Sequence, residues 1–507
     1  MIQKIDTYLN NITMYKITVY ALCAIALLSI AYGFLGILPL NAISLIVSLS
    51  VIIITCYISN KICQKISNLP TNNDSWLISA LILFLIIAPP DNYQSDILIT
   101  IIASTIAILS KYIFKLKNSH IFNPVAIALL TIGIFGFGNS IWWVGSASLA
   151  IPVAILGFLV VKKIRQSGMV FAFFITTLAT SSLFSLKNNI DIVKSIYEVV
   201  ISWPTIFLGT IMLTEPSTMP ATNLQRKIYG AVVGFLFSFQ FSFGPIFSSP
   251  ELAIVIGNVF SCLISPKQKT ILAFKTKLKI ARNTYEFVFE PDKKLTFLPG
   301  QYLELTLNTT TNDTRGNRRY FTIASSPTDT KVRFGIKFAD AKGSSFKDTI
   351  FNLRANDKVL AGNLGGDFVM PKDINKPLVF IAGGIGITPF ISMIRYLTNV
   401  KEKRPITLFY ANNTINDIAY KNVLDQANKK LGLKTIYLLT NKDLVSPNWK
   451  GEVGYLNEEI IKKYLKNHKE QTYYLSGPSA MVDSYKNLLA KIGIPNKQIK
   501  TDYFPGF

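Results

Sequence analysis

Three short motifs in the second half of this 507-residue chain combine residue types that bind nucleotide cofactors. The first, Arg-Tyr-Phe-Thr at 319–322, places a cation, aromatic rings and a hydroxyl group along one short run. A guanidinium group pairs with pyrophosphate, an aromatic ring packs against an isoalloxazine, and a hydroxyl group can hydrogen-bond to the flavin nitrogen N5. The run therefore predicts a strand that binds a flavin dinucleotide.

Two further motifs stand at the ends of apolar runs that are typical of strands. Residues 382–389, Ala-Gly-Gly-Ile-Gly-Ile-Thr-Pro, precede a helical pattern, so a dinucleotide phosphate could approach the N–H groups of a helix start. Residues 474–481, Tyr-Leu-Ser-Gly-Pro-Ser-Ala-Met, place Ser476 where it could face a cleft. Singly, a glycine cluster can also serve strand–helix packing, and Ser-Gly-Pro can be a plain turn. The order and spacing of all three motifs favour a flavin and nicotinamide site.

The residues around these motifs predict two kinds of sheet. Residues 270–370 alternate apolar and polar side chains in short runs separated by Gly, Pro and Asn, which is typical of an antiparallel β-barrel. After Lys376 strands alternate with helices, which is typical of a parallel, doubly wound α/β domain. We therefore expect a FAD-binding β-barrel domain at 267–373 and an NAD(P)-binding domain at 374–507.

Residues 268–507 closely resemble the ferredoxin-NADP reductase superfamily in these motifs and their order. The resemblance implies that Arg319 binds FAD phosphate, Phe321 stacks on the flavin and Thr322 bonds near N5. Residues 342–347, Lys-Gly-Ser-Ser-Phe-Lys, are similar to the pyrophosphate-binding helix start of that superfamily. Catalytic roles are implied for Thr322 and for Ser476, which replaces a frequent Cys. The implied cofactor-binding residues are Arg319, Tyr320, Phe321, Thr322, Gly343, Ser344, Ser345, Gly383, Gly384, Gly386, Thr388, Pro389, Gly477, Pro478, Met481 and Phe507.

The choice between NADH and NADPH depends on the residues that follow the strand at 406–410. In the superfamily a positive side chain there commonly receives the 2′-phosphate of NADPH, whereas this chain has Asn412 and Asn413. Asp417 would repel a phosphate dianion, and an Asn or Asp can bind a ribose hydroxyl. Lys442, in a later segment, leaves the choice open. We expect FAD as the bound flavin and NADH, rather than NADPH, as the hydride donor.

The first half of the chain has the composition of a membrane domain. The whole chain is 50% hydrophobic and 16% charged, whereas about a quarter of the residues of a soluble protein are charged. Residues 1–266 contain 14 basic and 8 acidic side chains, against 38 and 21 in the rest. Apolar stretches that could cross a membrane recur in this half. We expect ten spans, near 15–38, 41–60, 76–89, 96–113, 122–138, 141–161, 169–186, 195–213, 228–244 and 249–264.

The basic side chains of short loops predict which side of the membrane each loop faces, because Lys and Arg are enriched on the cytoplasmic side. With a cytoplasmic N-terminus, twelve basic residues lie on inner segments and two, Lys187 and Lys194, on outer loops. Ten spans then return the second half of the chain to the cytoplasm. We therefore expect a multi-pass protein of the cell membrane with its reductase domains in the cytoplasm.

Two polar, proline-containing turns interrupt the apolar stretches, at 120–124 and 214–220. Unpaired backbone at membrane depth is costly unless it lines a cavity, although capped helix ends at the membrane surface would give the same pattern. Glu215 is the sole carboxylate of these turns. We expect a membrane carrier site framed by Asn123, Pro124, Thr214, Glu215 and Pro216.

Residues 75–266 resemble two related membrane proteins, the B subunit of the sodium-translocating NADH:quinone reductase and the D subunit of the Rnf complex. The likeness rests on Phe122-Asn-Pro124, Trp142-Trp143, Leu213-Thr-Glu-Pro216 with Pro220, Tyr229-Gly230 and Glu251-Leu-Ala-Ile-Val-Ile-Gly-Asn258. It implies ten spans, a bound flavin such as FMN or riboflavin, and electron transfer across the bilayer by a domain at 1–266. The Ser-Gly-Ala-Thr-type run that carries covalent flavin mononucleotide in those proteins has no counterpart here, and residues 145–148, Gly-Ser-Ala-Ser, are a poor substitute.

Several classes of protein are disfavoured by the composition. The net charge of +23 is unaccompanied by a helix-turn-helix, zinc-finger or aromatic RNA-binding pattern, so we expect contact with anionic lipid and cofactors and not with nucleic acid. Two histidines, His120 and His468, cannot supply the four membrane ligands of two bis-histidine haems. All four cysteines lie in apolar runs, where packed thiols are a better account than a metal site, a disulfide framework or an intramembrane iron–sulfur centre.

The function we expect is electron transfer from NADH through FAD to a carrier in the membrane domain, and on to a quinone or an external acceptor. Hydride transfer needs no acid or base, so the protein would align the cofactors and tune the flavin potential. An alternative is an NAD(P)H flavin reductase at the cytoplasmic face, attached to a transporter-like membrane domain. The number of flavins per chain discriminates between the two.

Overall fold

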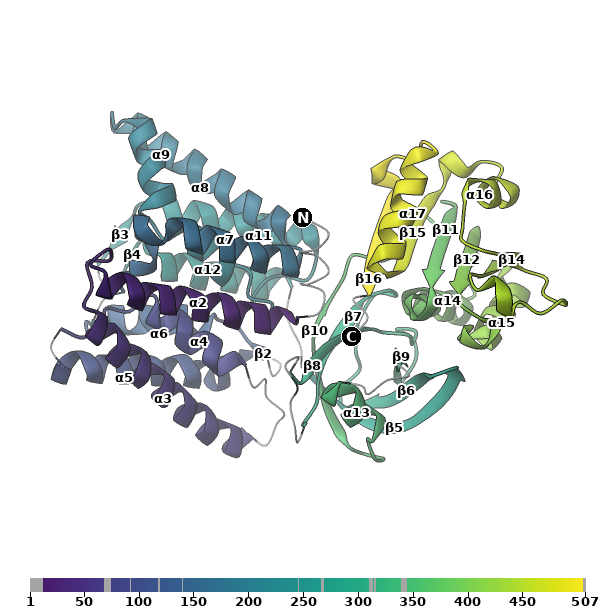
Figure 1. The fold of residues 1–507 in the computed structure, drawn as a ribbon, viewed down its shortest axis with the longest axis horizontal. Helices are drawn as coiled ribbons and strands as arrows, with labels where there is room; N and C mark the ends of the chain where they lie inside the picture. Colours follow the sequence, from purple (N-terminus) through teal and green to yellow (C-terminus); the bar gives the residue numbers. More distant parts are fainter. Residues whose placement is uncertain are drawn as a thin grey trace. The chain divides into compact units, whose positions relative to one another are not determined.

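The computed structural model describes residues 12–67, 74–91, 93–116, 119–138, 140–244, 246–265, 269–309, 313, 316–338 and 344–504. Apart from residues 313, 316 and 317, which lie with the first unit, they form two compact units that divide between Lys269 and Thr270. Figure 1 shows a helical unit in purple to teal and a unit of two sheets in green to yellow. The expected site residues Gly343 and Phe507 and the expected domain boundary at 266 lie outside the described residues. The boundary expected at 373 stays a prediction.

The described part of the first unit consists mainly of helices. In chain order the α-helices are α2 (Met14–Phe34), α3 (Ala42–Ser67), α4 (Ser75–Phe84), α5 (Tyr93–Ile113), α6 (Pro124–Ile134), α7 (Ala147–Ile164), α8 (Ser167–Lys187), α9 (Ile192–Ile201), α10 (Thr205–Phe207), α11 (Asn223–Ser238) and α12 (Pro250–Ile264). Two short hairpins join some of them: β1 (Lys115–Leu116) with β2 (Ser119–His120), and β3 (Ser242–Phe243) with β4 (Ile246–Phe247).

Five of the described helices, α2, α3, α5, α7 and α8, are long and apolar enough to cross a membrane. Two further helical segments, Ile192–Ile201 and Thr205–Met212, meet at 58° and form either a sixth, broken span or a re-entrant loop. Within the second segment, η2 (Leu208–Met212) is a π-helix. Helices α4 and α6 contain 10 and 11 residues, which at about 1.5 Å per residue reach roughly half the thickness of the hydrocarbon core. Five or six crossings are therefore supported, and the count of ten stays a prediction.

The chain leaves α4 inside the apolar bundle without leaving its backbone unpaired. The N–H groups of Ile141 and Trp142 donate to the Ile86 carbonyl at 3.1 and 3.0 Å. The Trp143 indole Nε1 donates to the Ile87 carbonyl at 3.0 Å. Since these buried carbonyl groups have donors from a distant segment, the chain can stop being helical here at little cost.

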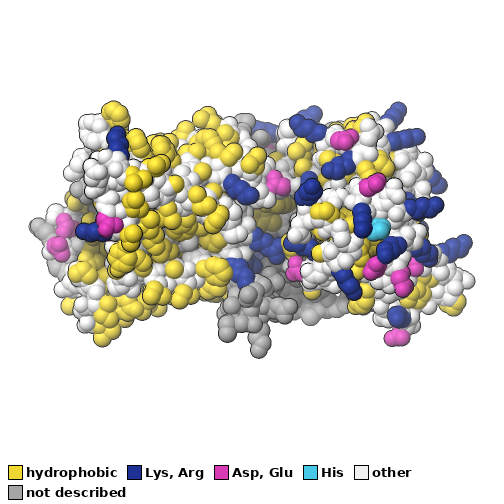
Figure 2. Space-filling view, turned by 90° about the horizontal axis from the view of Figure 1, so that it is seen from above, with side chains coloured by type: hydrophobic (Ala, Val, Ile, Leu, Met, Phe, Trp, Pro, Cys, Tyr) yellow, Lys and Arg dark blue, Asp and Glu magenta, His cyan; other side chains and the backbone are white. Residues whose placement is uncertain are grey.

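Hydrophobic side chains gather over much of the face of the helical unit that is turned to the viewer in Figure 2. Leu27, Ile151, Phe171 and Leu263 are 67 to 77% exposed. A continuous apolar surface of this extent on a folded unit marks contact with lipid or with another protein. Together with the long apolar helices, it indicates a unit that lies in a bilayer.

Helix α11 packs closely on α8 through two glycines. A Cβ atom at Gly230 would lie 2.3 Å from the Met169 carbonyl oxygen, and one at Gly234 would lie 2.6 Å from that of Phe173. The start of α11 is fixed by a capping box in which Thr222 and Gln225 bond to each other's backbone. This packing places Tyr229 in the fully buried interior.

The second unit begins with a six-stranded antiparallel sheet of order β8-β7-β10-β5-β6-β9. A bridge between Ile323 and Phe334 connects the residue after β8 to β9, so the two edges of the sheet approach each other. The predicted antiparallel architecture is confirmed as a curled sheet, and full closure as a barrel stays a prediction. The strands are β5 (Thr270–Ala281), β6 (Thr284–Pro291), β7 (Tyr302–Thr306), β8 (Arg318–Thr322), β9 (Val332–Lys337) and β10 (Lys358–Gly365), and helix α13 (Ser345–Phe351) precedes β10.

The chain then forms a six-stranded parallel sheet of order β14-β13-β12-β11-β15-β16, as the strand and helix alternation predicts. One apolar cluster packs α14 and α15 against it, and a second packs α16 and α17. The strands are β11 (Leu378–Gly383), β12 (Ile406–Asn412), β13 (Lys434–Leu439), β14 (Glu452–Val453), β15 (Thr472–Pro478) and β16 (Ile499–Phe504). The helices are α14 (Thr388–Val400), α15 (Lys421–Leu431), α16 (Glu458–Tyr464) and α17 (Ser479–Lys491).

A buried carboxylate joins the two sheets of this unit. Glu286 on β6 is 2% exposed and accepts hydrogen bonds from Arg333 of β9 and Arg395 of α14, both at 2.8 Å. Arg395 also donates to the Ala324 carbonyl at 2.9 Å. A buried carboxylate is stable only with such partners, so this arrangement fixes the α/β layer against the antiparallel sheet.

Candidate cofactor sites in the two units

Strand β8 displays the expected flavin-binding residues on its two faces. Arg319 and Phe321 share one face, because they are two residues apart on a strand. The Arg319 guanidinium lies over the Phe346 ring at 5.4 Å, and the Phe321 ring stacks on that of Phe346 at 5.7 Å. Tyr320 lies on the opposite face and meets Tyr302 edge to face at 5.3 Å. The cation and one aromatic ring are therefore together, while Tyr320 is apart from them.

Helix α13 supplies the other side of this face. Ser344 caps the helix, since its Oγ accepts from the Lys347 N–H at 3.3 Å, and Phe346 follows two residues later. The sequence missed Phe346, although it lies within the run that resembles a pyrophosphate-binding helix start. Ser344 and Ser345 thus lie on the element that contacts Arg319 and Phe321. Thr322 is 6% exposed and pairs with Tyr302 of β7.

The glycine-rich turn after β11 packs directly against the turn at the end of β15. A Cβ atom at Gly386 would lie 2.5 Å from the Ser476 carbonyl oxygen and 2.6 Å from the Gly477 Cα. A Cβ atom at Gly383 would lie 2.2 Å from the Met481 sulfur. The structure therefore brings together two motifs that lie about 90 residues apart in the sequence.

Gly384, at the tip of this turn, has the two properties that close approach of a ligand requires. Its φ is +54°, in the left-handed region that favours glycine, and a Cβ atom there would meet nothing within 4 Å. The turn opens helix α14, whose first residues are Thr388 and Pro389. A nucleotide phosphate would meet backbone N–H groups there, at the positive end of the helix.

Two polar side chains support this turn. The Tyr410 hydroxyl donates to the Gly384 carbonyl at 3.2 Å and accepts from the Ala419 N–H at 3.3 Å. Burial raises the pKa of Tyr410 above its ordinary value, so the hydroxyl stays protonated and keeps donating. Sequence analysis missed Tyr410, because its position on β12 carries no motif. Ser476 is fully buried, and its Oγ has no hydrogen-bond partner among the described residues, which fits a hydroxyl that awaits a ligand.

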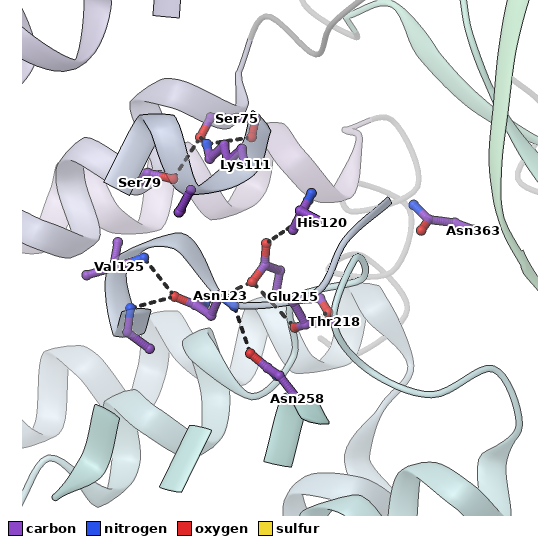
Figure 3. A network of polar contacts seen from close by, with 12 residues as sticks. Ser75, Ser79, Lys111, His120, Asn123, Val125, Glu215, Thr218, Asn258 and Asn363 are labelled. Carbon is purple, nitrogen blue, oxygen red and sulfur yellow. Dashed lines mark hydrogen bonds and ion pairs between the residues drawn. The ribbon is translucent and has the colours of Figure 1, made fainter. Parts of the chain in front are cut away.

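The expected carrier site in the helical unit is a network of polar side chains (Figure 3). The Asn123 Nδ2 donates to Glu215 Oε2 at 2.9 Å, and His120 Nε2 lies 3.5 Å from Glu215 Oε1. The Asn123 N–H donates to Asn258 Oδ1 at 2.7 Å, and Asn258 Nδ2 donates to the Tyr229 hydroxyl at 3.0 Å. Residues from four segments of the chain therefore meet at one place.

The structure places the other expected carrier residues differently. The Thr214 hydroxyl donates at 2.9 Å to the carbonyl of Thr210, which lies in the π-helix η2 just before it. Pro124 is the first residue of α6, where Asn123 caps the helix. Pro124, Thr214 and Pro216 therefore shape the turns, while Asn123 and Glu215 carry the polar contacts. His120, Tyr229 and Asn258 were missed as site residues, although the first stands in the predicted turn and the others in the resembling runs.

A second buried carboxylate lies outside this network. Glu251, in the first turn of α12, is 6% exposed. It accepts hydrogen bonds from the Ser140 hydroxyl and the Trp142 indole, both at 2.9 Å. Among the described residues, no group of three or more His, Cys, Asp or Glu side chains could hold a metal ion.

Two family models match separate parts of the chain. Residues 133–271 match the "NQR2, RnfD, RnfE family", and residues 380–487 match the "Oxidoreductase NAD-binding domain". The chain thus contains a segment similar to each of these two families. The NQR2, RnfD, RnfE match covers the segment that contributes Glu215, Tyr229 and Asn258. The NAD-binding match includes Gly383, Gly384 and Gly386 of the turn after β11 and Ser476 and Gly477 of the turn after β15, and thus covers both packed turns.

Curated relatives match part of the chain. Flavohemoprotein A from Dictyostelium discoideum is 24% identical over 45% of this chain and 58% of that protein. The F subunit of the Na(+)-translocating NADH-quinone reductase from Mannheimia succiniciproducens is 29% identical over 33% of this chain and 42% of that protein. The chain thus spans between two fifths and three fifths of the length of these relatives.

Solved structures also align with part of the chain. The FAD/NAD-binding domain of nitric oxide dioxygenase from Vibrio cholerae O1 biovar El Tor has a TM-score of 0.42 at 19% identity, over 46% of this chain and 98% of that chain. Ferredoxin-NADP+ reductase from Plasmodium falciparum has a TM-score of 0.40 at 21% identity, over 47% of this chain and 97% of that chain.

Proposed function

We propose that the chain is a membrane-bound flavoprotein oxidoreductase that takes hydride from NADH onto FAD. Electrons then pass to a carrier in the helical unit, which we propose is a second flavin, and on to a quinone or an external acceptor. The observation that carries the proposal is the presence of an NAD-binding domain and an NQR2, RnfD, RnfE domain in one chain. Both domains occur in proteins that transfer electrons, and their presence in one chain implies that electrons pass from one domain to the other.

The residues of the second unit fit FAD and a nicotinamide dinucleotide. Bound FAD would accept hydride and release electrons singly. Arg319 would pair with its pyrophosphate, and Phe321 or Phe346 would pack against an aromatic part of it. The open backbone at Gly384 would receive a phosphate of NADH, and the unpartnered Ser476 hydroxyl would bind near the nicotinamide. These groups bind and orient, and the step needs no protein acid or base.

The number of flavins tests this proposal. We expect detergent-purified protein to release two flavins per chain on acid treatment, one of them FAD, and to reduce ferricyanide with NADH. A single FAD per chain would contradict a flavin carrier in the helical unit. It would favour the alternative, an NAD(P)H flavin reductase at the cytoplasmic face attached to a transporter-like membrane domain.

We predict a preference for NADH over NADPH of roughly tenfold or more in kcat/KM. Asn413 is exposed after β12, and its Oδ1 accepts only a long hydrogen bond, at 3.4 Å, from Thr440. Asp417, which would repel a 2′-phosphate, is held by Thr414 at 2.8 Å and Lys337 at 3.2 Å. Asn413→Arg should relax or reverse the preference. Wild-type protein that favoured NADPH tenfold would instead assign phosphate recognition to another cation, such as exposed Lys442.

We also predict that the second unit lies in the cytoplasm and that the loop at Asp91 lies outside the cell membrane, from the basic-residue bias. In a variant without the native cysteines, Asp91→Cys should react with an impermeant thiol reagent in intact cells. Asn496→Cys, on the exposed surface of the second unit, should react only after lysis. The opposite pattern of labelling would overturn the orientation.

A further inference from the structure

The His120–Glu215 pair lies between a partly exposed end of the helical unit and a buried polar interior (Figure 3). The side chains of His120 and Glu215 are 12% and 24% exposed. Thr218, Tyr229 and Asn258, further in, are 3% exposed or less. By the basic-residue bias, this end faces the cytoplasm. The pair therefore stands where solvent meets the interior.

The contacts of Glu215 suit a proton better than a metal cation. Its Oε2 receives the Asn123 Nδ2 at 2.9 Å and the Thr218 hydroxyl at 3.4 Å, and its Oε1 faces His120 Nε2 at 3.5 Å. A hard cation needs several oxygen ligands that turn their lone pairs toward it. Here N–H and O–H donors turn toward one carboxylate. Ionisable side chains in contact inside a membrane domain characteristically relay protons.

The charged groups around the pair are cations. Lys111 of α5 and Lys269 act electrostatically on His120, and Lys111 is held by the Ser75 carbonyl at 2.9 Å. Lys115, opposite His120 in the β1–β2 hairpin, turns its ammonium group onto the Tyr112 ring. The Arg226 Nε of α11 donates to the Pro220 carbonyl at 2.8 Å. Lys111 and Lys269 are thus the cations that act on the pair, through His120.

Two hydroxyl groups, those of Thr218 and Tyr229, lie further inside the helical unit than the Glu215 carboxylate. The Thr218 hydroxyl donates to Glu215 Oε2 at 3.4 Å. Tyr229 is fully buried and joins the same network through Asn258, which bonds to the Tyr229 hydroxyl at 3.0 Å and to the Asn123 N–H at 2.7 Å. Because Tyr229 accepts a hydrogen bond from Asn258 Nδ2, its own O–H can still donate. The result is a run of groups that can each hold or pass a proton.

We propose that His120 and Glu215 form the entrance, and Thr218 and Tyr229 the continuation, of a proton path into the helical unit. The inference rests on the proposed function and extends it, because the path would supply the proton that a quinone or a flavin takes up on reduction. NADH gives two electrons and one proton, whereas a quinone takes two electrons and two protons. Because electrons leave FAD singly, the proton of the hydride would be released at FAD, and both protons of the quinol must be taken up from solvent. Each of them is delivered when the Glu215 O–H bond breaks. The carboxylate then regains a proton from His120, which takes one from cytoplasmic water.

Two acceptors separate proton delivery from electron delivery. Ferricyanide takes electrons alone, whereas ubiquinone-10 within liposomes takes electrons and protons and is reached through the membrane. In reconstituted protein, His120→Gln and Glu215→Gln should lower NADH-dependent ubiquinone-10 reduction about tenfold or more, and further as the pH rises. The solvent isotope effect on that rate should increase. Ferricyanide reduction should stay unchanged.

Matched substitutions and an optical measurement complete the test. His468→Gln and Glu198→Gln remove a His on the surface of the second unit and an exposed Glu of α9, and should leave both rates unchanged. Infrared difference spectra on adding NADH should show a carboxyl band that shifts in D₂O, persists in Glu198→Gln and is absent in Glu215→Gln.

Three results would overturn the inference. The first is ubiquinone-10 reduction at the wild-type rate in both variants, with an unchanged carboxyl band. The second is an equal loss of ferricyanide reduction and ubiquinone-10 reduction. The third is a rate that depends on Na⁺ concentration and not on pH. Failure of the proposed function would appear differently, as wild-type protein that reduces ferricyanide but not ubiquinone-10 with NADH, or that reduces neither acceptor.

Discussion

Replacing Arg319 by Ala should release FAD from the protein. Arg319 is 8% exposed and lies on the face of β8 that also carries Phe321. Its removal takes away the cation that would face two phosphate charges. A hydrogen bond to a charged group contributes about 1.5 to 3 kcal/mol, so two such bonds correspond to a loss of FAD affinity of a hundredfold or more. Equilibrium dialysis and the flavin absorbance of the purified protein measure this loss.

Two further variants make the result specific to the site. Arg319→Lys keeps the charge but loses the planar fork, and should retain an intermediate affinity. Arg354→Ala removes an exposed arginine from the loop after α13 and should retain FAD fully. If Arg319→Ala protein kept one FAD per chain and oxidised NADH normally, the flavin site would lie elsewhere.

Replacing Gly386 by Val should nearly abolish NADH oxidation while FAD stays bound. The new side chain would enter the space held by the Ser476 carbonyl and the Gly477 backbone, 2.5 and 2.6 Å from its Cβ atom. Because the neighbouring atoms are backbone, the turn after β11 and the turn after β15 would have to separate. A misplacement of about 1 Å at a reacting centre can cost a hundredfold in rate, and we expect at least that loss in kcat/KM for NADH.

Gly432→Asn is the matched control for this substitution. Gly432 ends α15 with φ of +75°, and a Cβ atom there would meet nothing within 4 Å. Asn tolerates this conformation, so kcat/KM should stay near the wild-type value. A Gly386→Val protein within threefold of wild type would show that the two turns need not touch for hydride transfer.

In the second unit, local sequence was sufficient to predict the two kinds of sheet and the positions of the motifs on them. Alternation and glycine spacing report on neighbouring residues, so strands β8, β11 and β15 and the turns after the last two could be predicted. Phe346 and Tyr410 could not, because each acts on a motif that lies elsewhere in the chain. Tyr320 lies on the opposite face of β8 from Arg319, as the period of two along a strand requires, and its role as a cofactor-binding residue stays a prediction.

In the helical unit, the composition of the sequence does not predict where each helix ends or which side chains meet. The apolar run at 76–89 predicts a single span, yet α4 ends at Phe84. The chain can stop being helical there because N–H groups of Ile141 and Trp142 reach the Ile86 carbonyl, and hydropathy carries no sign of that pairing. For the same reason, Glu215 was predicted as a site residue from its turn, whereas its contacts with His120 and Asn123 depend on the tertiary fold.

The Glu286 arrangement has a consequence for how this protein could have been assembled in evolution. Its carboxylate comes from the antiparallel sheet and one of its two arginines, Arg395, from the α/β layer. A recombination event that separated the two layers would leave Glu286 with half of its partners and Arg395 without its carboxylate. Loss of one partner of a buried ion pair typically costs about 3 to 5 kcal/mol, a large part of the stability of a domain. We therefore expect the two layers to have been joined to the membrane domain together, as one unit.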